Sequence, residues 1–161
     1  MAITEINHVT LIVNNLEETA EFYENELGLE PIPAFVFDYP TAFFKVTETQ
    51  QLHLSEWEDE MSFRGHVCFK VDNFNELFWR FKEQGIIDDK PWGKVRQLTD
   101  GAMQMFIRDP SGNLVEISSL GDPVDPKIFE DELYKEGLYV SGRNDFRGYK
   151  SEDATLYHGK Q

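Results

Sequence analysis

Three of the four histidines and one glutamate occupy corresponding places in two copies of a repeated sequence pattern. The stretch around His8 matches the stretch around His66 at an offset of 58 residues, and His53 and Glu116 each lie in the last apolar run of a copy. Imidazole nitrogens and carboxylate oxygens suit divalent Zn, Fe, Mn, Ni or Co, and buried ionisable groups without a metal or charged partner cost several kcal/mol each. The pattern favours one divalent metal ion held by these four residues. The alternative is a polar pocket that binds a ligand directly.

The runs that carry these residues have the alternation of β-strands. Alternate residues of a strand share a face, and the apolar set must face the helix that covers the sheet. In the first run Val9, Leu11 and Val13 form the apolar set, so His8 and Thr10 point the other way. The same rule assigns to the helix-free face His53, His66 and Glu116, together with Cys68 and Lys70.

Each copy is expected to hold a strand, a helix and three further strands. The helices follow Asn15 and Asn73, each with a glutamate three residues later that can complete a capping box, and Gly85 suits the end of the second helix. The further strands are expected at residues 34–38, 41–46 and 51–56, and at 94–98, 102–108 and 114–118. A short helix is expected over 126–136. The sequence therefore predicts an α+β fold built from two βαβββ units.

The repeat and its motifs resemble the vicinal oxygen chelate superfamily, which includes glyoxalase I, bleomycin and fosfomycin resistance proteins, methylmalonyl-CoA epimerase and extradiol dioxygenases. The motifs are Asn7-His-Val-Thr-Leu-Ile-Val13 with Phe22-Tyr23 and Leu27-Gly28, Gly65-His-Val67, and Asp109-Pro-Ser-Gly-Asn-Leu-Val-Glu116. The resemblance covers about residues 3–119 and implies paired βαβββ modules that form a curved, partly open β-barrel. It also implies metal ligands from the first and last strand of each module, which are here His8, His53, His66 and Glu116.

The resemblance implies chemistry in which the metal holds two neighbouring oxygens of a small substrate. Glyoxalase-like members usually have Glu or Gln at the place of His53, so Glu116 is the better candidate for the catalytic base and His53 is the second. Four protein ligands favour a lyase, isomerase or epimerase. If His53 points at substrate instead, the other three ligands form the triad of an Fe(II)-dependent extradiol-type dioxygenase.

Two further functions stay open. A fosfomycin-resistance-like thiol transferase would use Thr10 and a basic residue near Lys94 or Arg96, and a bleomycin-resistance-like protein would only bind a small molecule. The candidates for contact with substrate are Thr10, Lys45, Gln104 and Phe106. The alternative for Lys45 is a solvated lysine, and the alternative for Gln104 is a hydrogen-bonded glutamine in the core. Cys68 is expected to be a buried small hydrophobe rather than a nucleophile.

At the level of the chain, residues 1–120 are expected to form one domain from modules at about 3–58 and 63–119, with a partly helical or disordered extension at 121–161. Thirty acidic and fifteen basic residues give a net charge of −15, which disfavours nucleic acid and anionic membranes as partners. One cysteine, no apolar stretch long enough to span a membrane and no signal-peptide pattern favour the cytoplasm. Exposed edge strands and aromatic residues in the tail favour a homodimer.

Overall fold

The computed structural model describes residues 5–98 and 100–136. Within these residues the chain forms two compact units, one from 5–67 with 108–114 and one from 68–107 with 115–136. The expectations for the tail, including its aromatic residues and disorder beyond residue 151, lie outside the described residues. Among the described helices, none has the length and apolar character needed to cross a membrane.

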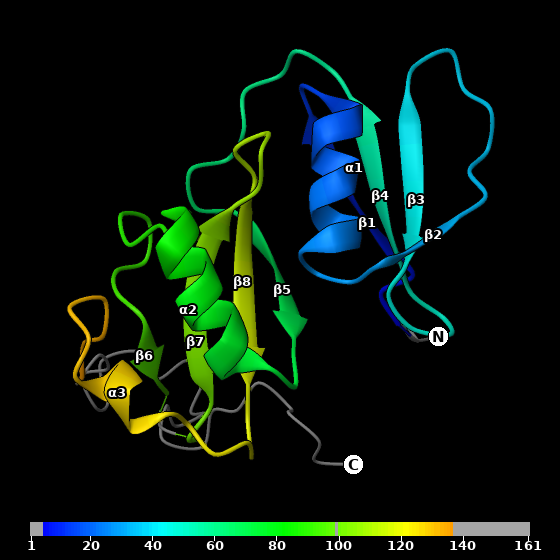
Figure 1. Cartoon of the computed structure of the whole chain (residues 1–161). Coiled ribbons are helices and arrows are strands. Elements are labelled where there is room, and N and C mark those ends of the chain that lie inside the picture. The colour runs from blue at the N-terminus through cyan, green and yellow to red at the C-terminus, as the bar shows by residue number, and fades with distance from the viewer. Residues whose placement is uncertain (1–4, 99, 137–161) are drawn as a thin grey trace, which may run out of the picture. The chain divides into compact units, whose positions relative to one another are not determined.

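The first unit is built on a four-stranded mixed sheet in the order β1-β4-β3-β2 (Figure 1). The strands are β1 (His8–Val13), β2 (Glu30–Ile32), β3 (Thr41–Lys45) and β4 (Gln51–Glu56). The first and last strands are parallel neighbours, with Thr10 opposite His53, and β3 is antiparallel to β4, with Phe43 opposite His53. The sheet therefore brings the first and last strands of the module side by side.

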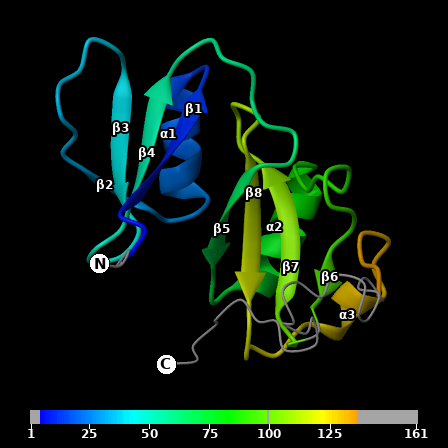
Figure 2. The same ribbon diagram turned by 180° about the vertical axis from the view of Figure 1, so that it is seen from behind.

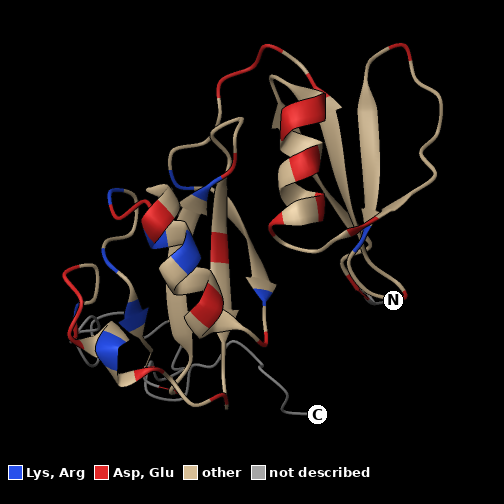
Figure 3. Cartoon of the chain, viewed as in Figure 1, with Lys and Arg blue, Asp and Glu red and all other residues tan. Residues whose placement is uncertain are grey.

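Helix α1 (Leu16–Asn25) packs on one face of this sheet, and the view from behind shows the face that it leaves uncovered (Figure 2). The helix begins as predicted, because the Asn15 side chain accepts a hydrogen bond from the Glu18 amide. Its exposed side is strongly acidic (Figure 3). Buried Tyr23 and half-buried Leu16 lie on the opposite side, so the helix covers the apolar face of the sheet.

The second sheet repeats this plan in the order β5-β8-β7-β6, and most of its residues belong to the second unit. Its strands are β5 (His66–Lys70), β6 (Arg96–Gln97), β7 (Met103–Arg108) and β8 (Leu114–Ser119). Helix α2 (Phe74–Gln84) buries the predicted stripe of Phe74, Leu77, Phe78 and Phe81 and ends at Gly85, whose φ of 69° is the left-handed conformation that glycine adopts without strain. The α+β fold of two βαβββ modules is therefore confirmed.

Some predicted elements are wrong in place or extent. Residues 34–38 form no strand, because the edge strand β2 pairs at 30–32 and its ladder stops before Pro33, which has no amide N–H to donate. The expected strand over 94–98 shortens to β6. Asn73 makes no side-chain cap bond at its ψ of 40°.

The helix expected over 126–136 is also shorter, because α3 covers only Pro126–Phe129. The Asp131 carboxylate accepts from the Leu133 amide and pairs with Lys82, so this side chain competes with continued helix.

A buried polar network joins the turn of residues 108–114 to α1 inside the first unit. The Tyr23 hydroxyl donates to the Asp109 carboxylate over 2.8 Å, and Ser111 Oγ lies 2.6 Å from the Thr19 hydroxyl. Asn113 donates to Asp109 and to the carbonyl of Ile12 in β1. The turn that leads into β8 is thus fixed by side-chain hydrogen bonds that connect residues about 90 positions apart.

Candidate metal site

His8 and His53 lie together on the helix-free face of the first sheet. Their rings are stacked, with centroids 4.3 Å apart and planes 17° from parallel. The strand alternation predicts this placement, and the parallel β1–β4 pairing brings the two rings into contact. Partial desolvation, followed by the charge of His8, lowers the pKa of His53. The lowered pKa favours the neutral imidazole, which is the form that binds a metal.

Each of these two rings is held at one nitrogen by an amide oxygen. His8 Nδ1 donates to Asn7 Oδ1 over 2.9 Å, and His53 Nε2 donates to Gln51 Oε1 over 2.8 Å. Because the proton stays on the bonded nitrogen, the lone pair lies on His8 Nε2 and on His53 Nδ1. Metal-binding histidines are held in this way by a second hydrogen-bonded group. The donor set therefore fits a divalent ion.

The second sheet carries the other two candidate ligands on adjacent strands. The Glu116 side chain is 5% exposed, and its Oε1 accepts a hydrogen bond from Gln104 Nε2 over 2.8 Å. His66 is exposed at the start of β5, and its Nδ1 donates to the backbone carbonyl of Arg64 over 2.9 Å. One polar atom of each candidate ligand is thus bonded to a neighbour, as in the first sheet.

Cys68 is exposed on β5, so the prediction that it is a buried small hydrophobe is wrong. It lies on the face of the strand that no helix covers. Partial desolvation, then the charge and hydrogen bond of Glu116, raise the pKa of its thiol to about 12. The thiol therefore stays protonated at neutral pH, in agreement with the expectation that it is not a nucleophile.

The four predicted ligands form two pairs, one on each sheet. Within residues 5–98 and 100–136, no group of three or more His, Cys, Asp or Glu side chains is arranged to hold a metal ion. The convergence of His8, His53, His66 and Glu116 on one ion therefore stays a prediction.

The candidates for substrate contact have different surroundings. Thr10 is exposed beside His53, whereas Phe106 is 4% exposed and packs near Trp92. Lys45 pairs with Glu48 over 2.6 Å at a polar pocket of about 460 Å³, which Asn7 and Gln51 also line. Gln104 bonds to Glu116, as described above. Contact of these four residues with substrate stays a prediction.

Sequence reasoning did not assign a role to the two amides that hold the histidine rings. Gln51 lies two residues before His53, and the strand alternation places both on one face, which is a signal for their contact. Asn7 precedes β1, and no pattern in the sequence marks its bond to His8.

Residues 5–117 match the model of the glyoxalase/bleomycin resistance protein/dioxygenase superfamily. The chain belongs to this superfamily. A lactoylglutathione lyase of Neisseria meningitidis is 30% identical over 122 residues, which cover 68% of this chain and 86% of that protein. The metallothiol transferase FosB of Shouchella clausii is 29% identical over 118 residues, which cover 70% of this chain and 77% of that protein.

Solved structures of the superfamily share the fold. A putative glyoxalase family protein of Bacillus anthracis superposes with a TM-score of 0.60 at 24% identity, covering 75% of this chain and 98% of that one. At this identity the likeness shows the fold alone. Membership of the superfamily confirms the resemblance drawn from the repeat and the motifs, and it leaves reaction and substrate to the site.

Proposed function

We propose that His8, His53, His66 and Glu116 bind one divalent metal ion and that the protein is a glyoxalase-like lyase, isomerase or epimerase. The observation that carries this proposal is the anchoring of all four side chains, each of which has one polar atom bonded to a neighbouring group. Such bonds set the orientation of a ligand before the ion arrives. When bound, the ion would polarise two neighbouring oxygen atoms of a small substrate as a Lewis acid.

The proton transfer is assigned to Glu116. Hydrogen bonds from Gln104 and with Cys68 hold the Glu116 carboxylate in place, and we assign to this carboxylate the removal of a proton from the substrate carbon beside a carbonyl group. The same carboxyl group then returns the proton to another position of the substrate, so the reaction needs no oxidant and no reductant. His53 is the second candidate for the base only if its Nδ1 lone pair does not bind the ion; its lowered pKa favours the neutral imidazole that could then accept a proton.

The experiment follows exchange of the methyl protons of pyruvate, a 2-oxoacid with two neighbouring oxygens, for deuterium by NMR. Protein stripped with a chelator should lose exchange activity, and Zn, Ni, Co or Mn should each restore part of it, in air or without air. Glu116→Gln should reduce exchange at least about 100-fold, the lower range for removal of a general base. Glu76→Gln, at an exposed carboxylate that pairs with Arg80 on α2, is the matched control and should change nothing.

An Fe(II)-dependent extradiol-type dioxygenase is the second candidate, because such an enzyme needs only three protein ligands. If His53 points at the substrate and does not bind the ion, His8, His66 and Glu116 form a triad of two histidines and one carboxylate. Cleavage of catechol that needs Fe(II) and O₂, and is lost on oxidation to Fe(III), would replace the first proposal with this one.

A thiol-transferase function is less well supported, because the basic residues expected to contact its substrate are bonded to other groups. Lys94 donates to the carbonyl of Glu132, and Arg96 donates to the carbonyls of Lys94 and Trp92. These hydrogen bonds engage the groups that would have to contact a phosphonate.

A further inference from the structure

Residues 33–40, between β2 and β3, expose apolar side chains to an unusual degree. Phe35 is 76% exposed, Val36 is 99% exposed and Phe37 is 43% exposed. The segment has a proline at each end, Pro33 and Pro40, which restricts the backbone where it leaves the sheet. Contiguous exposed apolar groups on a protein of such high net charge mark a binding surface.

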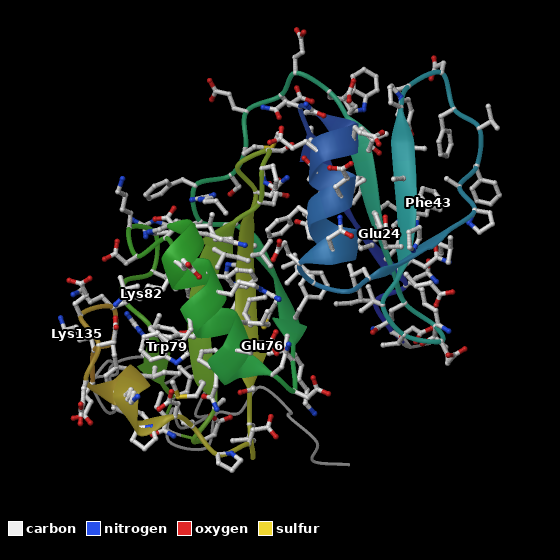
Figure 4. All side chains as sticks on the ribbon, in the orientation of Figure 1. Glu24, Phe43, Glu76, Trp79, Lys82 and Lys135 are labelled. Atoms are coloured by element: carbon white, nitrogen blue, oxygen red, sulfur yellow. The ribbon has the colours of Figure 1, made fainter. Side chains whose placement is uncertain are left out.

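The rings of this segment continue to the candidate metal site. Phe35 and Phe37 approach Phe43 with centroids 6.1 and 6.5 Å apart, and Tyr39 stacks on Phe37 at 5.0 Å. Phe43, which lies on β3 (Figure 4), stacks on His53 with centroids 3.5 Å apart and planes 2° from parallel. We call Phe35, Phe37, Tyr39 and Phe43 the aromatic strip. It runs without interruption from solvent to a predicted metal ligand.

The ring geometry of the aromatic strip suits a planar aromatic group. Phe35 meets Phe43 edge to face at 86° and meets Phe37 at 76°, so the exposed rings offer both faces and edges. Aromatic pairs gain from these arrangements beyond the apolar area that they bury, whereas an aliphatic chain gains from the area alone. Through Phe43, which stacks on His53, the exposed rings are connected to a predicted metal ligand.

We propose that the aromatic strip binds an aromatic ring of the substrate, so that the preferred substrates are aryl compounds with two neighbouring oxygens close to the ring. Aromatic 2-oxoacids have this chemistry. The inference rests on the proposed metal site, because that site holds the oxygens while Phe35 and Phe37 hold the ring. The strip thus supplies the specificity that the four ligands alone lack.

The test measures the affinity of the Zn-loaded full chain for phenylpyruvate and for pyruvate, which lacks the ring, by titration calorimetry. Phenylpyruvate should bind about 10-fold more tightly, the ratio that two favourable aromatic contacts supply. The double variant Phe35→Ala/Phe37→Ala should lose this preference, while its zinc content and its affinity for pyruvate stay within about 2-fold of wild type.

Two control variants show whether the effect belongs to the aromatic strip. Val36→Ala removes an exposed aliphatic side chain from the same segment, and Phe63→Ala removes a phenyl ring that is 55% exposed elsewhere in the first unit. Both should keep the preference for phenylpyruvate. Circular dichroism of each variant checks that the fold is intact.

The outcomes separate this inference from the proposed function. If the wild-type protein binds zinc but has equal affinity for the two acids, the proposed role of the aromatic strip is wrong and the proposed metal site is retained. Failure of wild type to bind zinc overturns the metal site and this inference with it. If the double variant keeps its preference but sediments as a smaller species, the strip contacts a second copy of the chain and the inference is wrong.

Discussion

The hydrogen bond from Gln104 to Glu116 is the contact that most directly controls a candidate ligand. It joins β7 to β8 over 2.8 Å and holds one oxygen of a carboxylate that is almost fully buried. Burial of a carboxylate is costly unless it is hydrogen-bonded, so this bond fixes the orientation of the side chain. Gln104 is therefore a positioning residue for Glu116, in addition to its predicted contact with substrate.

Gln104→Ala should weaken metal binding about 10- to 100-fold, the range for loss of a group that orients a ligand. A competition titration against a zinc chelator measures the change. Gln97→Ala is the matched control, because Gln97 is exposed and its side chain bonds only to the Gly101 carbonyl among the described residues. Equal affinity of the two variants would show that Gln104 does not position the ligand.

At the scale of the elements, the contact between α1 and the turn of residues 108–114 depends on a buried carboxylate. Burial raises the pKa of Asp109, while hydrogen bonds from Tyr23 and Asn113 lower it and only partly offset the burial. Because this pKa is raised in the folded state, its contribution to stability is largest at low pH and decreases as the pH rises through the raised value. The bond from Tyr23 limits that loss at neutral pH.

Tyr23→Phe should lower the free energy of unfolding by about 2 kcal/mol at pH 7, because it removes a hydrogen bond to a charged group. The loss should be smaller at pH 4, where a larger fraction of Asp109 is protonated. Urea unfolding at the two pH values measures both. Tyr39→Phe is the control, since no hydrogen bond of the Tyr39 hydroxyl occurs among the described residues. An equal loss for Tyr23→Phe at both pH values would contradict this account of Asp109.

The elements predicted correctly are those whose signals are local or repeated. The period of two in β1 and β5, the cap at Asn15 and the apolar stripe of α2 depend on neighbours a few residues away. The same alternation predicts the shared helix-free face of His8 and His53.

The errors and omissions come from contacts that local patterns do not contain. The apolar residues of 34–38 have the composition of a strand, yet they extend into solvent, where Phe35 and Phe37 contact Phe43. The bond from Tyr23 to Asp109 joins residues 86 positions apart, so the Asp109 motif gives the turn but not its partner.

At the scale of the whole molecule, the edge strands of the two sheets are candidate surfaces for the association of chains. Strand β1, with His8, lies at one edge of the first sheet, and β5, with His66, lies at one edge of the second. Edge strands present N–H and C=O groups that another strand can pair with. We therefore propose a homodimer, in which the modules pair within a chain or by exchange between chains.

Sedimentation velocity at high micromolar concentration should show a dimer of about twice 18.8 kDa. A monomer would contradict the proposal and would leave pairing within one chain as the only arrangement. Co-expression of His8→Ala with Glu116→Ala then separates the two arrangements. Exchange between chains restores one intact site in each mixed dimer, whereas pairing within a chain restores none.

The metal content of the purified protein tests the central claim most directly. Elemental analysis of protein purified without added metal should give about one divalent ion per chain, with ligand atoms about 2.0 to 2.3 Å from the ion in an anomalous map. His8→Ala and Glu116→Ala should each abolish stoichiometric binding and keep the wild-type circular dichroism spectrum. His158→Ala, which changes the one histidine that is not a candidate ligand, is the control and should keep the ion. Full metal content in the His8→Ala and Glu116→Ala variants, or an ion bound elsewhere in the map, would contradict the proposed site.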